Sequence, residues 1–113
     1  MKPILFFLFL SPILIWSQSS FEQGEALLKA GKTEQARVVF ENWLKENPSH
    51  LRTLEYLGDI AGQNKAWDKA ILYYKKLKQL RPSEADYQYK YGGVLGMKAK
   101  EVNKFKALGM ISE

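Results

Sequence analysis

The sequence predicts an all-α fold in which antiparallel helix pairs stack as a short solenoid. Glycines recur at a fixed interval, at Gly24, Gly58 and Gly92 (58 − 24 = 92 − 58 = 34), and a fixed period of this length is typical of helical repeat proteins. Between the glycines, apolar residues stand at i, i+3, i+4 and i+7, the spacing of one face of an α-helix. The chain has 113 residues, which is the length of one ordinary domain.

Other residue types recur with the same period and extend the pattern beyond the glycines. The equivalent positions are Ala36 and Ala70, Phe40 and Tyr74, Pro48 and Pro82, Leu57 and Tyr91, and Leu27, Ala61 and Leu95. In a repeat protein each unit buries its apolar face on the next unit. The composition, 46% hydrophobic and 26% charged, is that of a folded chain.

The first four helices are expected as two pairs. Residues 20–30 and 33–46 form the first pair, with a turn at Gly31-Lys32. The second pair covers the segment from Ser49 to the turn at 63–65, and then residues 67–80. A polar turn of two or three residues between two helices makes them antiparallel neighbours.

Hydroxyl side chains and prolines mark the expected helix boundaries. Thr33, Ser49 and Ser83 are the expected N-caps, because a hydroxyl oxygen accepts a hydrogen bond from a free amide of the first turn. Pro48 and Pro82 follow the helices that they end.

A third and weaker helix pair is expected over residues 84–97 and 98–111. Gly92, Gly93 and Gly96 fall inside it, and each lowers helix propensity by about 1 kcal/mol relative to alanine. We interpret these glycines as positions of close contact between helices.

This pattern resembles the tetratricopeptide repeat (TPR) family. In the second repeat, the family's large residue, Leu-Gly pair, medium residue, alanine, aromatic and proline correspond to Leu54, Leu57-Gly58, Ala61, Ala70, Tyr74 and Pro82. The resemblance covers residues 17–113 and implies a short TPR solenoid. The first repeat departs from the pattern before Gly24, and in the third repeat Lys104 replaces the small alanine. The segment 87–100 is similar to exported bacterial TPR proteins.

The N-terminal residues have the order of a secretory signal peptide. Lys2 is followed by the apolar segment 4–16 and then by small polar residues. This segment of thirteen residues, interrupted by Ser11 and Pro12, is shorter than the roughly 20 residues that a membrane-spanning helix needs. We expect cleavage after Ser17 or Ser19, and a protein exported to the periplasm or secreted. An uncleaved membrane anchor is the alternative.

These observations divide the chain into four parts. Residues 1–19 are the expected signal peptide, 20–48 the first repeat, 49–82 the second repeat, and 83–113 a partial or degenerate third repeat.

The composition leaves little for catalysis or metal binding. The chain has no cysteine and a single histidine, His50. It therefore cannot form a metal site from cysteine thiolates or from a cluster of histidines. The segment 92–96 lacks the Lys-Ser/Thr ending of a phosphate-binding loop. We expect no catalytic residue, no cofactor and no metal, and we do not expect an enzyme. The net charge of +5 is interpreted as lysines on solvated helix faces, and nucleic acid is not an expected partner.

The resemblance implies that the first helices of the repeats line a groove for a protein or peptide. Carried over position by position, the groove residues are Arg52, Glu55, Tyr56, Asp59, Gln63, Asp86, Tyr89 and Lys90, with Met97, Glu22, Glu25 and Lys29 as further members. Tyrosine and arginine are good anchors because they bury a large area and keep a polar tip. The alternative is that these residues are ordinary solvated side chains.

Two roles other than a binding module stay open at this point. The chain could be a structural or oligomerisation segment of a larger envelope protein, because the apolar residues 105–111 stand at its end without a capping helix and offer an edge for self-association. The lysine-rich segment 75–81 could instead bind an acidic surface, and a membrane is an expected partner only if the signal segment is retained.

Overall fold

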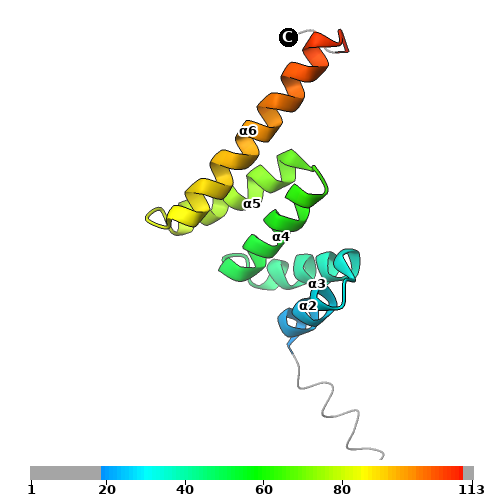
Figure 1. The fold of residues 1–113 in the computed structure, drawn as a ribbon. Helices are drawn as coiled ribbons and strands as arrows, with labels where there is room; N and C mark the ends of the chain where they lie inside the picture. Colours follow the sequence, from blue (N-terminus) through cyan, green and yellow to red (C-terminus); the bar gives the residue numbers. More distant parts are fainter. Residues whose placement is uncertain (1–18, 111–113) are drawn as a thin grey trace, which may run out of the picture. The chain divides into compact units, whose positions relative to one another are not determined.

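The computed structural model describes residues 19–110, and within this range the regular elements are all α-helices (Figure 1). In chain order they are α2 (Ser20–Lys29), α3 (Thr33–Glu46), α4 (Leu51–Gln63), α5 (Trp67–Leu80) and α6 (Ala85–Ala107). The all-α prediction is confirmed. Residues 1–18 of the expected signal peptide and residues 111–113 at the end of the expected third repeat lie outside the described residues.

The chain forms two compact units, Met1–Trp43 and Leu44–Glu113. In the described part of the first unit, α2 and α3 approach each other at Gly24. A Cβ atom on Gly24 would lie 2.5 Å from Cε1 of Phe40, and Phe40 is fully buried. The ring of Phe21 packs beside that of Phe40, with 5.8 Å between the centroids. The glycine therefore makes room for an aromatic ring of the paired helix.

The second unit repeats this contact between α4 and α5. A Cβ atom on Gly58 would lie 2.4 Å from Cε1 of Tyr74. Helix α5 packs against both α4 and α6. The core cluster of this unit contains Leu54, Ala61, Ala70, Tyr74, Leu77 and Val94.

Helices α2 and α4 end in two turns of the same type, which lie one period apart in the sequence. Gly31 and Lys65 both have positive φ, +77° and +58°. In each turn the amide of this residue donates to a carbonyl three residues earlier, and the next amide donates to a carbonyl five residues earlier. The donor–acceptor pairs are Gly31–Leu28, Lys32–Leu27, Lys65–Gly62 and Ala66–Ala61. These bonds satisfy the last carbonyls of each helix and reverse the chain.

The third helix pair, expected over residues 84–97 and 98–111, is wrong, because α6 runs without interruption to Ala107. One period after Lys65 stands Ala99 (65 + 34 = 99), which favours the helix and disfavours a left-handed turn. The turn comes at Gly109, with φ +72°. There the amides of Gly109 and Met110 donate to Lys106 and Phe105.

The three expected helix caps, Thr33, Ser49 and Ser83, are also wrong. His50, and not Ser49, is the N-cap of α4, where its Nδ1 accepts a hydrogen bond of 3.3 Å from the amide of Thr53. Glu84, and not Ser83, precedes α6 and makes no side-chain cap bond. The hydroxyl preference was overridden by the turns, which place the first free amide one residue later. Thr33 is the first residue of α3 and not the residue that precedes the helix, so it is not the N-cap.

The glycines of α6 do not make the close contacts expected of them. A Cβ atom on Gly92, Gly93 or Gly96 would meet nothing within 4 Å among the neighbouring parts of the described chain. The reason is the length of α6, since no second helix turns back onto it within residues 19–110.

We expect Gly58→Ala to lower the free energy of unfolding by about 2 kcal/mol, because its Cβ atom overlaps the Tyr74 ring. Gly62 is the matched control on the same helix, since a Cβ atom there meets nothing within 4 Å. Gly62→Ala should leave stability unchanged or raise it by up to about 1 kcal/mol. Urea unfolding followed by circular dichroism measures both. Equal effects of the two substitutions would contradict the proposed steric role of Gly58.

Candidate functional site

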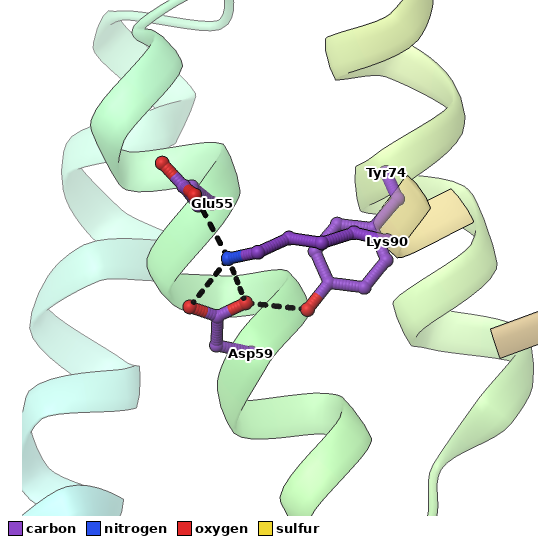
Figure 2. A network of polar contacts seen from close by, with 4 residues as sticks. All are labelled: Glu55, Asp59, Tyr74 and Lys90. Carbon is purple, nitrogen blue, oxygen red and sulfur yellow. Dashed lines mark hydrogen bonds and ion pairs between the residues drawn. The ribbon is translucent and has the colours of Figure 1, made fainter. Parts of the chain in front are cut away.

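Lys90 on α6 connects this helix to two carboxylates of α4 (Figure 2). Its Nζ donates to Oε2 of Glu55 at 2.8 Å, and to Oδ1 and Oδ2 of Asp59 at 2.9 and 3.1 Å. Glu55 and Asp59 stand four residues apart and therefore share one face of α4. Three of the eight predicted groove residues thus form a single ion-pair cluster.

Tyr74 of α5 completes the cluster. Its hydroxyl donates to Oδ1 of Asp59 at 2.5 Å, and the ammonium of Lys90 lies 5.8 Å from the centroid of its ring. Figure 2 shows the Lys90 side chain passing the Tyr74 ring on its way to the carboxylates. The polar network therefore ties α4, α5 and α6 together, next to the contact between Tyr74 and Gly58.

The network is partly screened from water and carries one net negative charge. The side chains of Lys90, Glu55 and Asp59 are 28%, 33% and 38% exposed. Burial lowers the pKa of Lys90, but the hydrogen bonds to Glu55 and Asp59 together outweigh it, so the pKa is raised. Burial, and then the hydrogen bond to Asp59, raise the pKa of Tyr74. Both groups keep their protons at neutral pH, which suits a link between helices better than proton transfer.

Two more predicted groove residues pair with each other on α4. Nη2 of Arg52 donates to the hydroxyl of Tyr56 at 3.2 Å, and the guanidinium carbon lies 5.8 Å from the Tyr56 ring centroid. Gln63, at the end of α4, and Asp86, in the first turn of α6, are exposed. The structure does not draw these two residues into the ion-pair cluster.

Tyr89 of the predicted groove is 82% exposed, the largest fraction among the exposed large hydrophobic residues of the described chain. It borders a shallow hollow of about 500 Å³ on the second unit. The hollow is lined by Tyr74, Gln88, Tyr89, Lys90, Gly92, Gly93 and Val94. Gly92 and Gly93 line it without side chains, and Lys90 and Tyr74 of the polar network also line it.

The remaining groove candidates contribute less. Met97 is exposed on α6. Glu22, Glu25 and Lys29 belong to the first unit, where Glu22 and Lys29 are exposed and Glu25 is half-buried.

Sequence reasoning missed several contacts that position this surface. Tyr74 was predicted only as the aromatic position of the second repeat, and the contacts of α5 with the second half of α6 were not expected. There, Nε1 of Trp67 donates to Oε2 of Glu101 at 2.9 Å, and Lys98 pairs with Asp68 at 2.5 Å. In both pairs the partners are separated by about one period of the sequence. A search for complementary polar residues at that separation would have found them.

The part of the chain that the structure describes, residues 19–110, holds no group of three or more His, Cys, Asp or Glu side chains placed to bind a metal ion. Among its helices, none combines the length and the apolar character needed to cross a membrane.

Comparison with known proteins identifies the repeat. Residues 21–85 match the family model described as tetratricopeptide repeat. The match covers α2 to α5 and ends at the first residue of α6. None of the curated proteins compared matches the chain.

We expect Lys90→Met to lower the free energy of unfolding at pH 7 by about 1 kcal/mol, because Glu55 and Asp59 lose the charge between them. The pKa values of Lys90 and Tyr74 are raised above their ordinary 10.5 and 10.0. Their stabilising contribution is therefore complete below about pH 10 and is lost as the pH rises further. The alkaline loss should be smaller in Lys90→Met.

Lys100→Met, at an exposed position of the same helix, is the control. Urea unfolding at pH 7, 9 and 10.5 provides the comparison. Identical pH profiles for Lys90→Met and Lys100→Met would show that the Lys90 network contributes nothing to stability.

Proposed function

The chain belongs to the tetratricopeptide repeat family, and we propose that it is an exported module that binds a peptide or another protein on the surface formed by α4 and α6. Repeats of this family generally mediate protein–protein interaction, and the fold is a binding fold rather than a catalytic one. We therefore assign the chain no enzymatic role, no cofactor and no nucleic-acid partner.

The observation that carries this proposal is the placement of Tyr89. A tyrosine that is 82% exposed beside a hollow of about 500 Å³ offers a large apolar area with a polar tip. Aromatic side chains of this kind dominate the energetics of interfaces. Gly92 and Gly93 line the hollow and have open space beside them, which leaves the backbone of α6 accessible to an incoming side chain.

The Lys90 network supports the proposal by fixing the anchor in place. Tyr89 directly precedes Lys90, whose ammonium is held by two carboxylates of α4. A pre-positioned anchor loses less conformational entropy on binding. Because Lys90, Glu55 and Asp59 already bond to one another, we assign them to positioning, and we assign the direct contacts to Tyr89, Arg52 and the exposed Asp86.

The order of the first nineteen residues supports export. A basic start, a short apolar segment and small polar residues at Ser17 and Ser19 are what a signal peptide requires. We propose that the mature protein acts in the periplasm or outside the cell, with an uncleaved anchor as the alternative.

We expect Tyr89→Ala to reduce capture of the partner from an envelope extract by at least about tenfold, because it removes the proposed anchor. The bait is the full chain, and quantitative mass spectrometry measures each captured protein. Leu72→Ala is the control, since Leu72 is an exposed apolar residue of α5 outside the hollow. Equal capture by Tyr89→Ala and the unchanged chain would overturn this surface and favour a structural or oligomerisation role.

Export is tested separately by expressing the full chain in a bacterial host and identifying its N-terminus by mass spectrometry. We expect a mature protein that begins at Gln18 or Ser20, found in the periplasmic or extracellular fraction. Leu8→Arg should block its appearance there, because a charge interrupts the apolar segment. An intact N-terminus in the membrane fraction would establish the anchor, and an intact N-terminus in the cytosol would contradict export.

A further inference from the structure

Gly92 is the third member of a series whose first two members have the same kind of partner. At Gly24 and Gly58, a Cβ atom would lie 2.5 and 2.4 Å from an aromatic ring of the following helix, that of Phe40 or Tyr74. At Gly92, a Cβ atom would meet nothing within 4 Å among the neighbouring described residues. One of three equivalent sites is therefore open.

The two filled sites define what the open site accepts. Each ring is carried by a helix, and each is preceded by a fully buried alanine four residues earlier, Ala36 before Phe40 and Ala70 before Tyr74. Residues four apart lie on the same helix face. The small residue lets the two backbones approach, and the ring then covers the glycine. The occupant is thus a helix with a small residue followed, four positions later, by an aromatic residue.

The chain does not supply this helix from its own α6. In the two filled sites the glycine and the ring are separated by the same interval (40 − 24 = 74 − 58 = 16). That interval leads from Gly92 to Leu108, which is the C-cap of the same continuous helix and is 62% exposed. At 1.5 Å per residue, about 24 Å of helix separate it from Gly92. Lys104 stands where the small residue would be needed. The half-repeat in α6 is therefore incomplete in both sequence and geometry.

The face around Gly92 suits a packed helix. Gln88, Gly92, Leu95 and Ala99 follow one another at i, i+4, i+7 and i+11, so they form one strip along α6. All four are exposed and none is charged, although α6 carries lysines on its other faces. Leu95 is 41% exposed and stands one period after Ala61, which is buried in the core of the second unit.

We propose that this strip is a docking site for a helix of another protein that bears a small residue and, four positions later, a phenylalanine or tyrosine. This goes beyond the binding of a ligand at Tyr89, because the helix would lie along α6 as α5 lies along α4. A second copy of the chain is not the occupant. Its own pairs, Ala36–Phe40 and Ala70–Tyr74, are at most 5% exposed and already cover Gly24 and Gly58.

The test uses a peptide of known docking geometry, residues 66–82 of this chain, which carries Ala70 and Tyr74. A hydrocarbon staple between positions 75 and 79, both exposed in the chain, keeps it helical. Backbone amide shifts of the full ¹⁵N-labelled chain are followed by NMR during titration. We expect saturable shifts over residues 88–99, and none with a peptide in which Tyr74 is replaced by alanine.

Two glycine variants separate docking from folding. Gly92→Ala should weaken the peptide at least about tenfold, because its Cβ atom occupies the place of the ring. Gly96→Ala should change the affinity less than about twofold, since its equivalent one period earlier, Gly62, has open space even with α5 in place. In the free chain both variants should raise the melting temperature by about 4 °C through helix propensity. Loss of binding by Gly92→Ala therefore cannot come from unfolding.

Several outcomes would overturn the proposal. These are the absence of shifts at millimolar peptide, equal affinity for Gly92→Ala and Gly96→Ala, or shifts centred on Gly58, which would mean that the peptide had replaced α5. Shifts that appear with increasing protein concentration alone would assign the strip to a second copy. The titration uses a defined peptide and the capture experiment uses an envelope extract, so the two tests fail independently.

Discussion

The structure depends first on the contact between an aromatic ring and a glycine. Tyr74 reaches Gly58 so closely that not even a methyl group fits between the two helices. This approach brings Ala70 and Leu77 into the core, where neither is exposed. It also places the Tyr74 hydroxyl within hydrogen-bond distance of Asp59. The Tyr74 side chain therefore makes both contacts: its ring packs on Gly58, and its hydroxyl joins the polar network.

The third helix of the second unit is held by a combination of apolar and charged contacts. Val94 is buried in the cluster with Tyr74 and Leu77. On one side of it in the sequence, Lys90 bonds to the carboxylates of α4, and on the other, Glu101 accepts from Trp67. The polar pairs thus add to the apolar packing of Val94, Tyr87 and Tyr91 in holding α6 against the core. Such pairs contribute more than exposed ones, because screening by water and salt is weaker there.

The repeat period made most of the fold predictable from the sequence. It placed Phe40 and Tyr74 at equivalent positions, and the helices over residues 33–46 and 67–80 are confirmed. The prediction of two helices over residues 84–111 failed, because the repeat period alone does not determine where a helix ends. Gly31 and Lys65 adopt the required left-handed conformation, whereas Ala99 one period later does not. Local turn chemistry overrode the repeat.

For the candidate site, the sequence predicted that Glu55, Asp59 and Lys90 share one surface, but it did not predict the contacts between them. Glu55, Asp59 and Lys90 share the predicted face of the repeat, yet they bond to one another, and that pairing depends on how far apart successive helices lie. Residue spacing shows which face of a helix a residue occupies, but it does not give the distance between two helices. The hollow beside Tyr89 is likewise a product of packing, since it forms where glycines meet no partner among the described residues.

The short reach of these contacts has a consequence for how the chain folds. Asp59 and Tyr74 are separated by 15 positions, and Glu55 and Lys90 by 35. Contacts limited to about one repeat give a low contact order, and low contact order is associated with rapid folding because little loop-closure entropy must be lost first. A further repeat would add contacts of the same sequence separation. An array of this kind can therefore grow by duplication without a matching loss of folding speed.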